Sequence, residues 1–183
     1  MLEIIAVLST LLCVYLSSKE NIWCWPVGII GVVTFFIVFL EQKLYAETTL
    51  QIIFLYQSIM GWYNWNKGNG SNKLPVTKIS NDRFVRDIVA TSILAFGVGY
   101  LLDELTTTTQ PYLDSYTACI SLLANGYLVK KYLQAWVLWV TVDVMLIIMF
   151  INQGLSLSAL LYGVLLIFST NGFIQWRRNL KMV

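Results

Sequence analysis

Histidine is absent from this 183-residue sequence, and only 12% of the residues carry a charge. A soluble domain normally has about 25% charged residues, so the composition argues against a water-soluble enzyme. Histidine is also the commonest metal ligand and the usual proton carrier near neutral pH, so zinc and haem sites are disfavoured. We therefore expect no enzymatic activity, no cofactor and no bound metal.

Motifs for several other chemistries are missing as well. Cys13, Cys24 and Cys119 form no CxxC pair and are odd in number, so we expect packing roles rather than disulfides. No GxxxxGK(S/T) sequence is present to power the protein with ATP, and no basic tract is present to bind nucleic acid. The apolar segments contain no deep lysine or arginine, so a phosphorylated ligand is not expected either.

The sequence is instead rich in long apolar segments, and 57% of its residues are hydrophobic. Polar breaks divide it into seven continuous runs, each near the roughly 20 residues that a membrane-spanning helix needs. The expected spans are 2–17, 22–40, 44–65, 84–102, 113–129, 133–151 and 155–176. The sequence therefore predicts an all-α integral membrane protein with seven transmembrane helices, forming a single membrane domain over residues 1–183.

The placement of positive charge predicts how these spans are oriented. Eleven of the twelve lysines and arginines lie after spans one, three, five and seven, and Lys43 alone lies on the other side. Basic residues concentrate in the short loops on the cytoplasmic side of a membrane. We therefore expect the amino end outside and the carboxyl end inside.

An internal repeat is indicated when spans two and three are laid on spans six and seven. At a shift of 114 residues, Trp25 falls on Trp139 and Trp62 on Trp176. The interpretation is repeat one at about 1–66, a linker helix at about 84–102 and repeat two at about 113–176. Such a parallel 3+1+3 arrangement is that of SWEET proteins, which bind substrate near the midplane between the repeats. Transport is the favoured function class.

Asp143 is the acidic residue deepest inside a span, where a charge costs about 2.5 to 3.5 kcal/mol by insertion scales. Trp136 and Trp139 precede it at helical spacing, so two indoles and a carboxylate share a face that suits a flat cation. Two simpler readings stay open. Asp143 could instead form a helix–helix hydrogen bond with a serine or asparagine, and Trp136 could anchor the membrane interface.

Neutral polar residues on three other spans complete the predicted substrate site. They offer the donors and acceptors that a small ligand's amide and hydroxyl groups need. Serine and threonine also serve helix packing in membranes, and Trp62 could be an interface anchor, so these alternatives remain. The predicted set is Gln51, Gln57, Ser58, Trp62, Thr117, Ser121, Asn125 and Asn171, together with Trp136, Trp139 and Asp143.

Four strings give the sequence a family resemblance: LYAETTLQIIF at 44–54, GWYNW at 61–65, LDSY at 113–116 and KKYLQAWVLW at 130–139. Together they resemble the PnuC family of bacterial vitamin transporters. The resemblance implies a SWEET-like fold, a homotrimer and facilitated uptake across the bacterial inner membrane, with a separate cytoplasmic kinase trapping the vitamin. It also implies that the family's WxxW motif falls on Trp136 and Trp139, and its span-three glutamine on Gln51.

The resemblance implies that the substrate is a vitamin, and the residues within the spans indicate that this vitamin is cationic and unphosphorylated. Family members similar to nicotinamide riboside carriers have asparagine where this chain has Gly31, Ser58 and Asp143. That departure favours thiamine, the substrate of the PnuT branch, over nicotinamide riboside, which is the alternative. A ligand-free membrane scaffold subunit is a more distant alternative.

Overall fold

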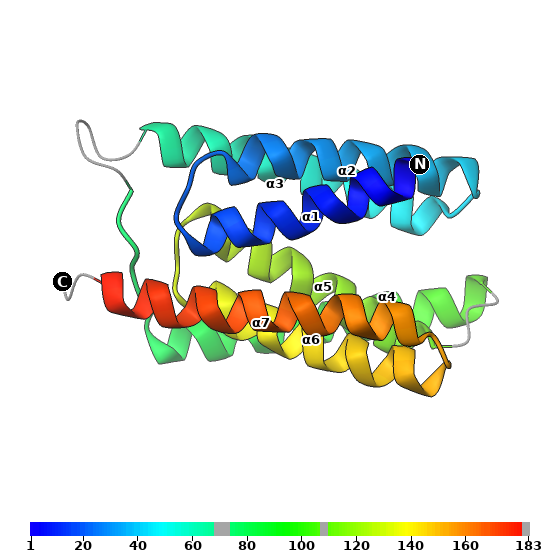
Figure 1. Ribbon diagram of the computed structural model, residues 1–183. Helices are drawn as coiled ribbons and strands as arrows, with labels where there is room; N and C mark the ends of the chain where they lie inside the picture. The colour runs from blue at the N-terminus through cyan, green and yellow to red at the C-terminus, as the bar shows by residue number, and fades with distance from the viewer. Residues whose placement is uncertain (68–73, 107–109, 181–183) are drawn as a thin grey trace.

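The computed structural model describes residues 1–67, 74–106 and 110–180, and within them the chain forms seven α-helices. Their bounds are α1 Leu2–Ser18, α2 Cys24–Glu41, α3 Tyr45–Lys67, α4 Asn81–Leu105, α5 Pro111–Val129, α6 Gln134–Asn152 and α7 Ser156–Asn179. The helices lie side by side, with the two chain termini at opposite ends of the bundle (Figure 1). The predicted all-α fold with seven helices is confirmed.

α4 is longer than the expected span, and a capping residue explains where it begins. Ser80 has extended backbone dihedrals, and its hydroxyl accepts a hydrogen bond from the Arg83 backbone N–H at 3.4 Å. A serine in this position satisfies one of the free N–H groups at a helix start. The helix therefore begins at Asn81, among charged residues that hydropathy alone excludes.

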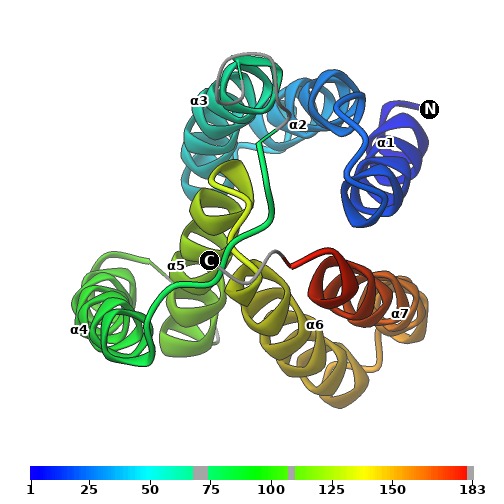
Figure 2. The same ribbon diagram turned by 90° about the vertical axis from the view of Figure 1, so that its left-hand side faces the viewer.

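Six of the helices form a ring. Each contacts its neighbours in the order α1, α2, α3, α5, α6, α7, and α7 closes the ring on α1. α4 packs on the outside against α5 (Figure 2). The ring is therefore made of two three-helix units, α1–α3 and α5–α7, which meet at the α3–α5 and α1–α7 contacts.

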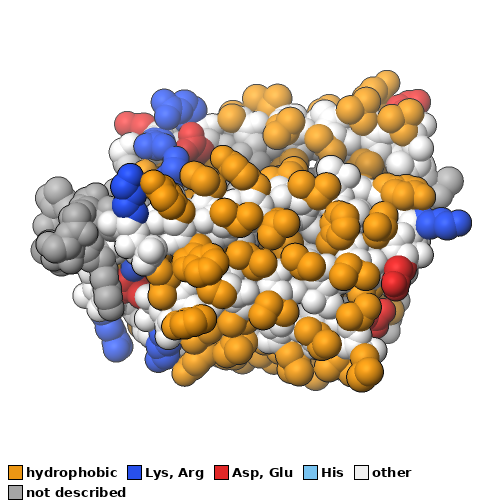
Figure 3. All heavy atoms as spheres, turned by 90° about the horizontal axis from the view of Figure 1, so that it is seen from above, with side chains coloured by type: hydrophobic (Ala, Val, Ile, Leu, Met, Phe, Trp, Pro, Cys, Tyr) orange, Lys and Arg blue, Asp and Glu red, His pale blue; other side chains and the backbone are white. Residues whose placement is uncertain are grey.

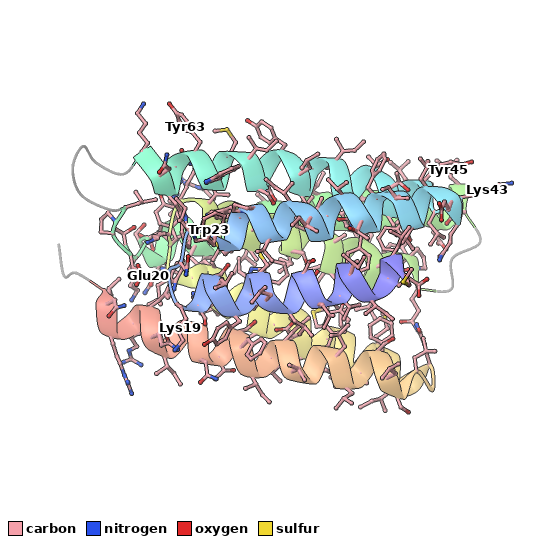
Figure 4. The ribbon with its side chains drawn as sticks, turned by 45° about the horizontal axis from the view of Figure 1, so that its top comes forward. Lys19, Glu20, Trp23, Lys43, Tyr45 and Tyr63 are labelled. Carbon is pink, nitrogen blue, oxygen red and sulfur yellow. The ribbon has the colours of Figure 1, made fainter. Side chains whose placement is uncertain are left out.

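The outer surface has the character of a membrane protein. α2, α4, α6 and α7 are long and apolar enough to cross a membrane by length and composition. Hydrophobic side chains cover the middle of the face shown in Figure 3, while lysine and arginine gather mainly at one end. Trp23 and Tyr63 are exposed at that basic end and Tyr45 at the other (Figure 4), the usual placement of interface aromatics.

The two three-helix units repeat at 111 residues, not at the 114 predicted from the sequence. The turns establish the register, because Glu20 and Lys131 have φ of 54° and 53°, and Lys43 and Gly154 have φ of 60° and 73°. Such left-handed backbone is uncommon outside glycine, so its recurrence at one spacing is specific. A shift of three residues keeps apolar helix faces nearly aligned, which is why matching apolar residues gave the wrong register.

At the 111-residue register Trp25 corresponds to Trp136, and Trp65 corresponds to Trp176. The predicted matches of Trp25 with Trp139 and of Trp62 with Trp176 are therefore wrong. These four indoles are buried in one hydrophobic cluster at the basic end of the ring. Trp65 donates a hydrogen bond to the Leu128 carbonyl at 3.2 Å. Trp176 does the same to the Ser17 carbonyl at 3.1 Å. Ser17 and Leu128 are themselves 111 residues apart, so each unit's last helix is tied to the first helix of the other.

Candidate functional site

A pair of amides joins the two units across the α3–α5 contact. Asn125 Nδ2 donates to Gln57 Oε1 at 2.9 Å, and Gln57 Nε2 donates to the Leu122 carbonyl at 3.0 Å. Asn125 is buried and Gln57 is half-buried. The structure therefore brings two of the predicted site residues into direct contact, at a junction between the repeats.

Three predicted hydroxyl groups are also buried, but they bond within their own helices. Ser58 donates to the Phe54 carbonyl at 2.8 Å, and Ser121 to the Thr117 carbonyl at 2.7 Å. Thr117 donates to backbone carbonyls one turn earlier in α5. Such bonds satisfy a hydroxyl hydrogen in an apolar environment while leaving the oxygen able to accept.

Asp143 lies in the contact between α6 and α7. Its side chain is nearly inaccessible, with 2% of the residue surface exposed, and its Oδ2 accepts a hydrogen bond from Ser169 at 2.9 Å. This is the helix–helix arrangement that the sequence left open as the alternative to a ligand contact. Sequence reasoning did not single out Ser169, although the 111-residue register pairs it with Ser58.

The two tryptophans of the WxxW motif occupy different environments. Trp136 is 1% exposed and packs edge-on against Trp176, with ring centroids 5.4 Å apart. It is therefore a core residue at the basic end rather than an interface anchor in contact with lipid headgroups. Trp139 is half-buried one helical turn deeper in α6 and packs against the same cluster.

The remaining predicted residues lie apart from the buried set. Trp62 is 45% exposed, in agreement with the interface-anchor alternative. Asn171 is exposed, two residues after Ser169 and hence on the opposite side of α7. Gln51 is half-buried two helical turns before Ser58 on the same face of α3.

A charge pair between buried Lys131 and partly buried Glu20 lies at the basic end of the ring. Lys131 is 3% exposed, and its Nζ lies 2.9 Å from Glu20 Oε2 and 4.4 Å from the centroid of the Trp65 ring. Asn179 of α7 donates to the other oxygen of Glu20 at 2.8 Å. The positive charge of Lys131 is therefore already compensated by a carboxylate.

These features describe a membrane-embedded ring with buried neutral donors and acceptors, indoles and compensated charges. Amides and indoles can bind a small polar ligand, and indole faces attract flat cations. Such binding is non-covalent and requires no reactive side chain. It is the kind of interior that a carrier needs to replace part of a ligand's hydration.

Comparison with known proteins agrees with this description. The family model described as "Nicotinamide mononucleotide transporter" matches residues 1–178. The "Nicotinamide riboside transporter PnuC" of Escherichia coli (strain K12) is 27% identical over 201 aligned positions, covering 96% of this chain and 84% of that protein. The protein of the same description from Neisseria mucosa is also 27% identical, covering 97% of this chain and 72% of its own length.

A solved structure shares the fold. The "Crystal structure of the Vitamin B3 transporter PnuC" superposes with a TM-score of 0.77 at 21% sequence identity, covering 97% of this chain and 80% of that one. The predicted family resemblance and the predicted class of membrane transporter, rather than enzyme, are confirmed. With its seven-helix fold and a match over nearly its whole length, the chain belongs to the nicotinamide mononucleotide transporter family.

Proposed function

We propose that this protein carries nicotinamide riboside across the bacterial cytoplasmic membrane by facilitated diffusion. The observation that carries the proposal is the similarity, over 96% or more of this chain, to proteins described as nicotinamide riboside transporters. The substrate is a flat pyridinium cation with a carboxamide and ribose hydroxyls. Indole faces suit the ring, and buried amides suit the neutral groups.

The proposed contacts come from both repeats. Gln57 and Asn125 supply amide groups at the α3–α5 junction, and Trp139 supplies an indole face on α6. The hydroxyl oxygens of Ser58, Thr117 and Ser121 remain able to accept hydrogen bonds. Asp143, one turn beyond Trp139 on α6, supplies negative charge close to the pyridinium while Ser169 holds one of its oxygens.

The preference for thiamine drawn from the sequence loses its structural basis. It rested partly on Gly31, but a side chain at Gly31 would meet Ser9 and Thr10 of α1 at 3.3 to 3.4 Å. Close packing between α1 and α2 is therefore a sufficient reason for glycine there. Ser58 likewise has a backbone partner within α3, and the relatives named above are described for nicotinamide riboside.

The family's description names the mononucleotide, yet the interior favours the unphosphorylated riboside. A phosphate needs an available cation when it leaves water. Among the described residues the buried cation is Lys131, and Glu20 already pairs with it. We infer that the riboside enters without phosphate and that a separate cytoplasmic kinase then traps it.

The remaining parts of the proposal concern assembly and orientation. The basic end, which carries Lys19, Lys67, Lys130, Arg177 and Arg178, faces the cytoplasm by the positive-inside rule. The amino end then lies outside. Three such chains assemble as a homotrimer with one ring per subunit.

Calorimetry on the purified protein tests the substrate directly. We expect nicotinamide riboside to bind, with nicotinamide mononucleotide and thiamine each at least about tenfold weaker, a difference of about 1.4 kcal/mol. Tighter binding of thiamine than of nicotinamide riboside would instead favour thiamine as the substrate. Tighter binding of the mononucleotide would show that a phosphate is accommodated.

A further inference from the structure

Three buried side-chain polar atoms in the described residues have no hydrogen-bond partner: Trp25 Nε1, Trp136 Nε1 and Ser17 Oγ. An unpaired buried donor costs free energy comparable to a lost hydrogen bond, so such groups are rare. Here two of the three are the same atom of the same residue type. Trp25 and Trp136 also hold the same position in the two repeats.

The surroundings of the two indoles are equivalent as well. Trp25 packs over Gly61 of α3, and Trp136 packs over Gly172 of α7, so closely that a side chain at either glycine would overlap the indole. Gly61 and Gly172 are again 111 residues apart. An arrangement that appears twice, glycine included, is a built feature of the fold rather than an accident of packing.

The other two indoles of the cluster provide the contrast. Trp65 and Trp176 are also buried in this cluster, with 5% and 0% of their surfaces exposed, but their N–H groups donate to the Leu128 and Ser17 carbonyls. The cluster therefore contains two indoles whose N–H groups hold the helices together and two whose N–H groups are unused.

Trp25 and Trp136, the two indoles whose N–H groups have no partner, lie on either side of the axis of the ring. α3 and α7 stand opposite each other in the ring order, yet Trp65 and Trp176 meet with centroids 5.9 Å apart. Trp25 contacts Trp65 at 5.3 Å and Trp136 contacts Trp176 at 5.4 Å. The four rings thus form a row across the ring at its basic end, with an unused N–H in each outer member.

We propose that Trp25, the repeat counterpart of the predicted site residue Trp136, is itself a substrate-contacting residue whose indole N–H donates a hydrogen bond to a neutral oxygen of the transported ligand. This rests on the proposed function and extends it to Trp25, which lies outside the WxxW motif. The chemistry fits nicotinamide riboside, which has a carboxamide oxygen and ribose hydroxyl oxygens as acceptors. Substrate reaching the row of indoles supplies the partner that the protein itself lacks.

The test is a matched pair of substitutions, Trp25→Phe and Trp65→Phe. Both remove an indole from the cluster, but only the second removes an existing hydrogen bond, the one that Trp65 donates to the Leu128 carbonyl. We expect Trp25→Phe to raise the Kd for nicotinamide riboside about three- to tenfold in calorimetry. Trp65→Phe is expected to change that Kd less than twofold while lowering the melting temperature further than Trp25→Phe does.

Trp136→Phe repeats the test on the second unit and is expected to raise the Kd by a similar factor, which keeps the proposal testable if Trp25→Phe does not fold. A ribosylpyridinium ligand without the carboxamide identifies the acceptor. If the carboxamide oxygen accepts, wild type and Trp25→Phe bind this ligand equally; if a ribose oxygen accepts, the variant again binds it more weakly.

Unchanged affinity of Trp25→Phe and Trp136→Phe for both ligands, beside a wild type that binds nicotinamide riboside, would overturn this inference and leave the proposed function standing. Failure of the wild type itself to bind nicotinamide riboside would overturn the proposed function, and this inference with it.

Discussion

At the scale of single residues, the clearest polar contact is the Asp143–Ser169 hydrogen bond between α6 and α7. Ser169→Ala removes the donor and leaves a buried carboxyl group unsatisfied, so we expect a loss of about 1 to 3 kcal/mol in stability. Thermal melting in detergent measures it. Ser58→Ala at the equivalent position of the first repeat is the control, because the Ser58 hydroxyl donates only within its own helix. Equal melting temperatures for the two variants would contradict a stabilising role of the Asp143–Ser169 hydrogen bond.

The Gln57–Asn125 pair gives a second prediction at this scale. Gln57→Ala and Asn125→Ala should each weaken nicotinamide riboside binding, and the double variant should lose less than the sum, because the two amides act as one unit. A double-mutant cycle of Kd values from calorimetry provides the coupling energy. Additive losses would mean that the amides act independently.

The contacts of individual side chains were the least predictable feature from the sequence. Asp143 could be recognised as exceptional because charge is rare within a span, but its partner could not, since Ser169 lies on another helix. In the sequence, Trp25 stood out only as one of the residues that match between the repeats. Its unused N–H group becomes evident only when the neighbours of every indole are known.

At the scale of helices, glycines allow α2 to approach α3 and α6 to approach α7. A Cβ at Gly172 would lie 2.6 Å from a ring carbon of Trp136, and one at Gly61 would overlap Trp25. We expect Gly61→Ala and Gly172→Ala to lower stability by about 1 to 3 kcal/mol through overpacking. Gly163→Ala is the control: a Cβ there meets nothing within 4 Å, so alanine's higher helix propensity should leave the melting temperature equal or higher.

Helices were predictable from the sequence because each had to present apolar side chains to lipid over its length. The register between the repeats was not, because neighbouring shifts preserve an apolar face equally well. The left-handed turn residues carried the missing information, and three of them, Glu20, Lys43 and Lys131, are not glycine.

At the scale of the whole molecule, the Glu20–Lys131 pair joins the turn of one repeat to the turn of the other. Lys131 is buried, so Glu20→Gln leaves its charge without a carboxylate. We expect a loss of about 1 to 3 kcal/mol, less than for a fully buried pair because the Glu20 side chain is 21% exposed. The exchange of the two residues, E20K with K131E, should recover part of the melting temperature, whereas a further decrease would show that the pair is not held by its charges.

For the whole molecule, the proposed function is passive transport of nicotinamide riboside through this ring. Uptake of labelled nicotinamide riboside into liposomes that contain the purified protein tests this function most directly. We predict saturable uptake that stops when the inside and outside concentrations are equal, without ATP or an ion gradient, and that excess unlabelled riboside suppresses. Uptake no faster than into protein-free liposomes, or accumulation above the outside concentration, would contradict it.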